Sequence, residues 1–197
     1  MKLIILDRDG VINFDSDAYI KSPAEWRPIP GSLEAIARLN QYGYRVAVAT
    51  NQAGVSRGLF DMKMLNAIHH KLHTSAQAVG AHIDAIFFCP HAADENCDCR
   101  KPKPGMMQAI GRRFETPLKG VPIVGDSLRD LQAGFMVGCT PHLVMTGKGS
   151  KTLEKGGLPP GTAVFENLAA VVDRLLHSEL LAAETVDAAR TALQKKK

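Results

Sequence analysis

The sequence predicts an α/β fold in three layers, with a mostly parallel central sheet between helices. Two observations favour this fold. Short apolar runs alternate along the chain with longer amphipathic segments, which is typical of consecutive strand–helix units. The runs are apolar without interruption and rich in branched side chains, as expected of strands that are buried on both faces. The 197 residues suffice for one domain with a substantial core.

The elements can be placed in chain order from apolar runs and capping residues. Ser32 and Asp61 can each cap the start of a helix, and Gly43 and Gly138 are suited to follow helix ends. The expected strands are residues 3–6, 44–49, 83–88, 123–125, 142–145 and 163–165. The expected helices are residues 32–42, 61–79, 105–114, 128–137 and 167–176, followed by a helix-prone tail over 178–197.

Composition excludes several classes of protein. The formal net charge is +4, but the last three residues are lysines, so the rest of the chain carries only +1. A nearly neutral body with 6% aromatic residues argues against a nucleic-acid groove. No apolar run is long enough to span a membrane, and the N-terminus enters the first strand directly, without the pattern of a signal peptide. We therefore expect a cytoplasmic, monomeric protein.

The first strand ends in a charged turn, Asp7-Arg-Asp9-Gly10. Gly10 permits the backbone to turn so that both carboxylates face one site. Two carboxylates this close repel each other unless a cation lies between them. The turn therefore predicts a Mg²⁺ site, and a solvated pair of aspartates remains the alternative.

Other expected strands also end in polar residues. In a parallel sheet the carboxyl ends of the strands lie at one edge, so these residues should converge there. Asp7 and Asp126 offer hard oxygen ligands for Mg²⁺, while the hydroxyl of Thr50 and the charge of Lys101 suit the oxygens of a phosphate. One carboxylate could then attack phosphorus while its neighbour moves a proton.

The long polar segment over residues 11–30 follows the first strand. Loops of this length are usually functional or disordered, and its position favours contact with a substrate through Asp15, Asp17 and Tyr19. Trp26 is expected to pack beneath the loop. A further pair, His69 and His73, is spaced for a metal, but no third ligand accompanies it, so a solvated helix face is the better interpretation.

Three of the four cysteines lie in one short segment, Cys89-Pro-His91 followed by Cys97-Asp-Cys99. Two such pairs can complete a tetrahedral shell on Zn²⁺. Because side chains fill every position of that shell, the site should be structural. Reduced cysteines packed around a turn are the alternative interpretation.

Four motifs resemble those of the haloacid dehalogenase superfamily of phosphatases. They are Asp7-Arg-Asp9-Gly-Val, Thr50-Asn-Gln, Lys101-Pro-Lys-Pro-Gly and Gly125-Asp126-Ser-Leu-Arg-Asp130. The resemblance implies a Rossmann-like fold without a large cap domain, formed by residues 1–177. It also implies that Asp7 is the nucleophile and Asp9 the general acid and base. Mg²⁺ would be bound by Asp7, the Asp9 carbonyl and Asp126, while Thr50 and Lys101 stabilise the phosphoryl group.

Within the superfamily, the cysteine segment resembles that of phosphatases acting on heptose bisphosphates or histidinol phosphate. Residues 50–60 and 144–148 resemble the heptose group. That resemblance implies removal of the C7 phosphate of a heptose 1,7-bisphosphate in the synthesis of lipopolysaccharide core sugars, with Arg57 and Arg100 at the second phosphate. Asn51 and Gln52 would also contact substrate. Histidinol-phosphate phosphatase is the alternative, and a DNA 3′-phosphatase is a more distant one.

Overall fold

The computed structural model describes residues 1–194, and across them the chain forms a six-stranded sheet in which every neighbouring pair is parallel. The order is β3-β2-β1-β4-β5-β6, so β1 lies at the centre beside both β2 and β4. The predicted three-layer α/β fold is confirmed. The strands are β1 (Lys2–Leu6), β2 (Tyr44–Asn51), β3 (Ala85–Cys89), β4 (Pro122–Gly125), β5 (Thr140–Val144) and β6 (Ala163–Phe165).

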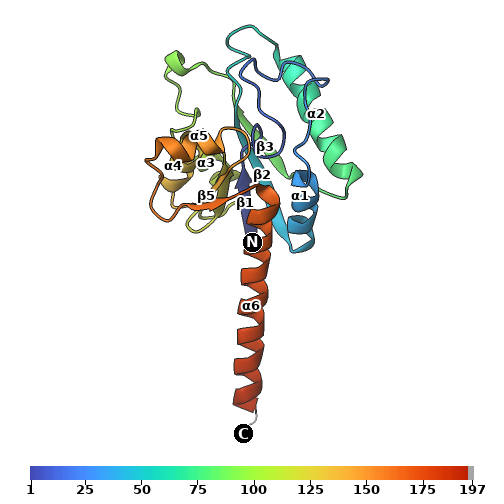
Figure 1. Ribbon diagram of the computed structural model, residues 1–197, viewed down its shortest axis with the longest axis vertical. Coiled ribbons are helices and arrows are strands. Elements are labelled where there is room, and N and C mark those ends of the chain that lie inside the picture. Colours follow the sequence, from blue (N-terminus) through green and yellow to red (C-terminus); the bar gives the residue numbers. More distant parts are fainter. Residues whose placement is uncertain (195–197) are drawn as a thin grey trace.

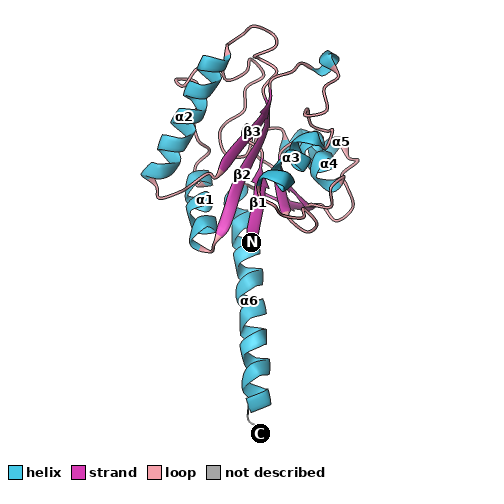
Figure 2. Cartoon of the chain, turned by 180° about the vertical axis from the view of Figure 1, so that it is seen from behind, coloured by secondary structure: helices cyan, strands magenta, loops and turns pink. Residues whose placement is uncertain are grey.

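Helices cover both faces of the sheet (Figure 1). The α-helices are α1 (Ser32–Gln41), α2 (Met62–Ala78), α3 (Gly105–Arg113), α4 (Leu128–Phe135), α5 (Gly149–Lys155) and α6 (Leu168–Gln194). A short 3₁₀ turn, η1, spans Ala93–Glu95. Figure 2 shows α1 and α2 on one side of the strands and α3 and α4 on the other.

The strand periodicity accounts for the two cores. Ile4 and Leu6 of β1 pack in the cluster that includes residues of α1, α2 and the first turns of α6. Leu3 and Ile5 alternate with them and pack in the second cluster, with residues of α3 and α4. Both sets are almost completely buried, which is why the run is apolar at every position. β1 is thereby held rigidly at the centre of the molecule.

The structure differs from the sequence prediction at several elements. β3 begins at Ala85 rather than at residue 83, because the Asp84 side chain binds β2. Its carboxylate accepts a hydrogen bond from the Val46 amide (2.8 Å) and forms an ion pair with Arg45 (2.6 Å). The α5 helix was not expected, since its seven residues begin with Gly-Ser and form no apolar stripe. The last helix is longer than predicted.

The α6 helix continues through the proposed boundary at residue 177 and projects beyond the sheet (Figure 1). Its earlier turns are anchored, because Glu179 accepts hydrogen bonds from Lys2 (2.5 Å) and from the Tyr44 hydroxyl (2.7 Å). The division of the chain into a domain over 1–177 and a tail stays a prediction. In the part of the chain that the structure describes, no helix combines the length and the apolar character needed to cross a membrane.

The long loop between β1 and α1 is packed against the body of the protein. Trp26 is completely buried, as expected, and its carbonyl accepts a hydrogen bond from Lys71 of α2 (2.9 Å). The Ser32 hydroxyl donates to the Val11 carbonyl at the other end of the loop (2.9 Å). These contacts hold the intervening residues over the carboxyl end of the sheet.

Replacing Trp26 by alanine should destabilise the fold. The change leaves a large cavity, and comparable truncations of buried aromatic residues cost about 3–5 kcal/mol of the free energy of unfolding. Urea denaturation measures this value. Phe14→Ala is a matched control, because Phe14 belongs to the same loop but is 47% exposed, and it should cost less than about 1 kcal/mol. Equal losses in the two variants would contradict the prediction.

Candidate active site

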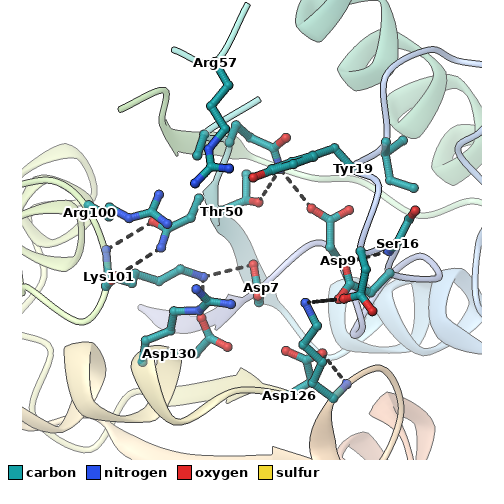
Figure 3. A pocket seen from close by; sticks show the side chains of 18 residues that line it. Asp7, Asp9, Ser16, Tyr19, Thr50, Arg57, Arg100, Lys101, Asp126 and Asp130 are labelled. Atoms are coloured by element: carbon teal, nitrogen blue, oxygen red, sulfur yellow. Dashed lines mark hydrogen bonds and ion pairs between the residues drawn. The ribbon is translucent and has the colours of Figure 1, made fainter. Parts of the chain in front are cut away.

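A pocket of about 300 Å³ opens at the carboxyl ends of the central strands (Figure 3). The chain runs outward from β1 to β3 and then crosses over to β4 on the other side of β1. Because the strands are parallel, their carboxyl ends lie at one edge of the sheet. The pocket is lined by every residue that was predicted for catalysis, Mg²⁺ or substrate: Asp7, Asp9, Asp15, Asp17, Tyr19, Thr50, Asn51, Gln52, Arg57, Arg100, Lys101 and Asp126. It also includes residues that were not predicted to contact substrate or Mg²⁺ or to take part directly in catalysis: Ser16, Ile20, Ala53, Arg129, Asp130 and Lys148.

Lys101 lies at the floor of the pocket and is 2% exposed. Its ammonium group contacts Asp7 Oδ1 (2.9 Å) and Asp130 Oδ1 (2.6 Å), and it donates to the Ala49 carbonyl of β2 (2.5 Å). Burial alone would lower the pKa of Lys101, but the two carboxylates outweigh it and the pKa is raised. The pocket therefore contains a permanently charged cation beside Asp7.

The carboxylates of Asp7, Asp126 and Asp130 are crowded, with ligand oxygens within 4.8 Å of one another. Burial, followed by the charge of Asp130, raises the pKa of Asp7 well above its usual value, although Lys101 opposes the shift. Burial and the charge of Asp130 also raise the pKa of Asp126 to about 7. Lys101 cannot neutralise three carboxylates, so the donor set and its charge fit a divalent cation with a preference for oxygen ligands.

Two glycines allow the backbone to surround Asp126 closely. Gly10 has a φ of +82°, and a Cβ added there would lie 2.0 Å from Asp126 Oδ2. Gly147 has a φ of +58°, and its Cβ would lie 2.2 Å from the same oxygen. The amide of Lys148 donates to this oxygen at 2.7 Å. The turn predicted at Gly10 is therefore needed both for its conformation and for the close approach.

Asp9 has quite different surroundings from Asp7. Arg8 donates to both of its oxygens, with Nε and Nη2 at 2.9–3.1 Å. The side-chain amides of Asn13 (2.8 Å) and Gln52 (2.9 Å) add two further donors. Burial raises the pKa of Asp9, but the charge of Arg8 and these hydrogen bonds outweigh it, so the pKa is lowered. Asp9 is therefore held as an oriented carboxylate.

The Thr50-Asn51-Gln52 motif joins the end of β2 to the Asp9 carboxylate and to the backbone of Lys101. Gln52 Nε2 bridges Thr50 Oγ1 (2.8 Å) and Asp9 Oδ2. The Asn51 amide donates to the Lys101 carbonyl (3.0 Å) and accepts from the Lys101 amide (3.1 Å). The reciprocal pair fixes the backbone of Lys101 against β2, so Asn51 is engaged with the main chain as well as lining the pocket.

The four ligands of the predicted zinc site also come together. Cys89, His91, Cys97 and Cys99 offer ligand atoms within 4.8 Å of one another. Cys97 Sγ lies 3.5 Å from each of the other two sulfurs, close to the ~3.7 Å that a tetrahedral shell with Zn–S bonds of ~2.3 Å requires. The four side chains therefore fit a closed metal site.

The cysteine cluster is linked directly to the pocket. Arg100 follows Cys99 in the chain, lines the pocket, and donates through Nη1 to the His91 carbonyl (3.0 Å). The guanidinium of Arg57 lies over the ring of Tyr19 (5.8 Å). Figure 3 shows Arg57 reaching toward the pocket from the side opposite Asp126, and Arg100 beside Lys101. A second anionic group could bind there.

Two of these further lining residues contact charged groups. Asp130 belongs to the fourth motif and pairs with Lys101, and the sequence signal was its spacing after Asp126. Lys148 pairs through Nζ with Asp15 (2.9 Å) and Asp17 (3.3 Å). Lys148 lies two residues after Thr146, shortly after the end of β5. This position is the signal that could have indicated that Lys148 lines the pocket, because strand ends meet at this edge.

The expectation that His69 lies on a solvated helix face is wrong. His69 is 8% exposed, and its Nε2 lies 3.3 Å from Arg8 Nη1. Its ring packs against Phe88 with centroids 5.9 Å apart. The helical period explains this position, because residue 69 lies beside Leu65 and Leu72 on the buried stripe of α2.

Two family models match the sequence. The model of the polynucleotide kinase 3 phosphatases matches residues 2–132, and the HAD-hydrolase-like model matches residues 98–171. The first covers all four motifs. The second begins at the cysteine segment and extends into α6.

Curated relatives are similar over nearly the whole of their length. A D-glycero-beta-D-manno-heptose-1,7-bisphosphate 7-phosphatase of Bordetella bronchiseptica is 61% identical, over 89% of this chain and 98% of that protein. One from Pseudomonas aeruginosa is 55% identical, over 88% and 97%. A crystal structure of the B. bronchiseptica D,D-heptose 1,7-bisphosphate phosphatase, complexed with magnesium and phosphate, matches with a TM-score of 0.89 and 61% identity, over 90% of this chain and 99% of that one.

The affinity of the carboxylate site for Mg²⁺ should rise with pH. The pKa of Asp126 is raised to about 7, so at a lower pH the cation must displace a proton from this group. The apparent affinity should therefore be about tenfold lower at pH 6 than at pH 8. Titration calorimetry at the two pH values measures this ratio. Asp126→Asn should bind weakly at both, and an equal affinity of the unaltered protein at pH 6 and pH 8 would contradict the prediction.

The cysteine cluster should contain one Zn²⁺ per chain, and Cys97→Ser should lose most of it. Because the metal orders the backbone beside Arg100 and Lys101, the variant should also lose thermal stability and turnover together. Elemental analysis of protein purified without chelators measures the zinc. Cys139→Ser is the matched control, since Cys139 is a buried free cysteine outside the cluster, and it should retain zinc. Fully active protein without zinc would refute the assignment.

Proposed function

The chain belongs to the haloacid dehalogenase-like phosphatases, and we propose that it removes the C7 phosphate of D-glycero-D-manno-heptose 1,7-bisphosphate. This hydrolysis belongs to the biosynthesis of nucleotide-activated heptose for the lipopolysaccharide core. The observation that carries the proposal is the coincidence of two features in one pocket: the pair of Asp7 with the buried Lys101, and two further cationic side chains, Arg57 and Arg100, in the lining. The relatives that match over nearly their full length are named for this reaction, with the β anomer.

In the proposed mechanism, a carboxylate oxygen of Asp7 attacks the phosphorus of the C7 phosphate. The bond from phosphorus to the sugar oxygen breaks, and Asp9 gives the leaving alkoxide a proton. Asp9 then takes a proton from water, which attacks the aspartyl-phosphate and releases inorganic phosphate. Thr50 and Lys101 stabilise the phosphoryl oxygens. The ion pair of 2.9 Å between Lys101 and Asp7 supports this assignment, because it places the ammonium beside the attacking group.

Mg²⁺ is the catalytic cofactor. The residues that would hold it are Asp7 and Asp126, through their carboxylates, and Asp9, through its backbone carbonyl. When bound, the cation supplies positive charge that neutralises the phosphate and the crowded carboxylates. The raised pKa values of Asp7 and Asp126 support this assignment, because both are caused by burial and by the negative charge of neighbouring carboxylates. Zn²⁺ is the structural metal of the cysteine loop.

The C1 phosphate would remain on the product and be held by Arg57 and Arg100. Arg100 is already oriented by the His91 carbonyl, and Arg57 by the ring of Tyr19, so little side-chain freedom is lost on binding. Asp15, together with the polar side chains at the end of β2, could accept hydrogen bonds from sugar hydroxyls. We assign no nucleic-acid or membrane partner. We propose that the enzyme is a monomer and that it acts in the cytoplasm.

A comparison of substrates tests the proposal. We expect kcat/KM to be highest for heptose 1,7-bisphosphate, with one anomer favoured, and far lower for histidinol phosphate and for a 3′-phosphorylated oligonucleotide. Phosphorus NMR should show that the C7 phosphate is released and the C1 phosphate retained. Asp7→Asn should nearly abolish turnover without loss of fold, which assigns the activity to this pocket. A preference for either of the other substrates would overturn the proposed function.

A further inference from the structure

The α2 helix, which contributes no side chain to the pocket, nevertheless contacts the catalytic centre through one buried chain of polar groups. Arg8 is completely buried between Asp9 and His69. One edge of its guanidinium, formed by Nε and Nη2, binds both oxygens of Asp9. At the opposite corner, Nη1 lies 3.3 Å from His69 Nε2. In the described part of the chain, Nη1 has no other hydrogen-bond partner.

We infer that His69 is a positioning residue, which accepts a hydrogen bond from Arg8 and thereby fixes the orientation of the Asp9 carboxylate. The inference rests on the proposed function, in which Asp9 is the general acid and base. A guanidinium can only donate, so His69 Nε2 must be the acceptor and the neutral ring carries its proton on Nδ1. Burial, together with the charge of Arg8, lowers the pKa of His69 to about 3, which agrees with a neutral ring.

The geometry explains why this contact matters to Asp9. The guanidinium is planar and rigid, so a partner at Nη1 fixes the plane in which Nε and Nη2 meet the carboxylate. The Phe88 ring packs against His69 and limits its rotation. Asn13 and Gln52 hold Asp9 from other directions. Small losses of alignment at a proton-transfer group have large effects on rate. By binding Nη1, His69 restricts the rotation of the Arg8 guanidinium and thereby of the Asp9 carboxylate.

Leaving-group dependence distinguishes this role from general stabilisation. A sugar alkoxide needs a proton from Asp9 as it leaves, whereas p-nitrophenolate does not. His69→Leu removes the acceptor with a side chain of moderate size, and the unpaired buried donor should disturb Arg8. Rapid-quench single turnovers should show phosphorylation by the heptose bisphosphate slowed about tenfold. The burst of p-nitrophenolate should slow less than about twofold, and His69→Gln, which restores an acceptor oxygen, should recover most of the loss.

Two controls accompany the measurement. His70→Leu alters the exposed neighbour on the same helix and should leave both rates unchanged. Nitrogen NMR of the unaltered protein should show the His69 ring neutral, with its proton on Nδ1. This result does not depend on the folding of any variant. Equal losses on the two esters, a Gln variant no better than the Leu variant, or a proton on Nε2 would each overturn the inference.

The two proposals fail in different ways. If the unaltered enzyme does not release the C7 phosphate, the proposed function is wrong. The rate ratios are then measured with whichever alkyl phosphate the enzyme hydrolyses, because any alkoxide requires the same proton. The inference on His69 is tested only by the comparison of variants on a poor and a good leaving group, whatever the natural substrate.

Discussion

The ion pair of one buried ammonium group with two carboxylates holds the pocket together. Lys101 joins Asp7 at the end of β1, Asp130 on α4 and the Ala49 carbonyl on β2, three segments that are distant in sequence. Without this cation the crowded carboxylates would repel one another in a buried environment. The sheet order makes the arrangement possible, since β1 lies between β2 and β4.

The position of Lys101 depends in turn on the cysteine loop that precedes it. Cys99 is two residues before Lys101, and Asn51 fixes the Lys101 backbone from the side of β2. Zinc in a closed shell cannot activate water, because no ligand position is open. Its contribution is to restrict the backbone on the other side of Lys101 and Arg100. The structural metal and the proposed catalytic groups are therefore parts of one rigid unit.

Local signals predicted most of the fold and the pocket, and the failures have a common cause. Uninterrupted apolar runs identify β1 and β2, and a parallel sheet necessarily brings their ends together. The helical period explains why His69 is buried beside Leu65 and Leu72, but no local pattern predicts its contact with Arg8, which is 61 residues away. Lys148 was likewise undetermined, since its partners Asp15 and Asp17 lie in a loop of unpredictable path. Contacts between polar side chains from distant segments depend on tertiary structure.

Asp7 and Asp9 are two residues apart, yet their surroundings shift their pKa values in opposite directions. These shifts are the reverse of what the proposed reaction requires, since a nucleophile must be ionised and an acid protonated. Loading the pocket corrects both. A cation beside Asp7 lowers its pKa, and a dianionic phosphate near Asp9 raises the pKa of that group. Binding of metal and substrate therefore shifts the pKa values of both carboxylates toward what the proposed reaction requires.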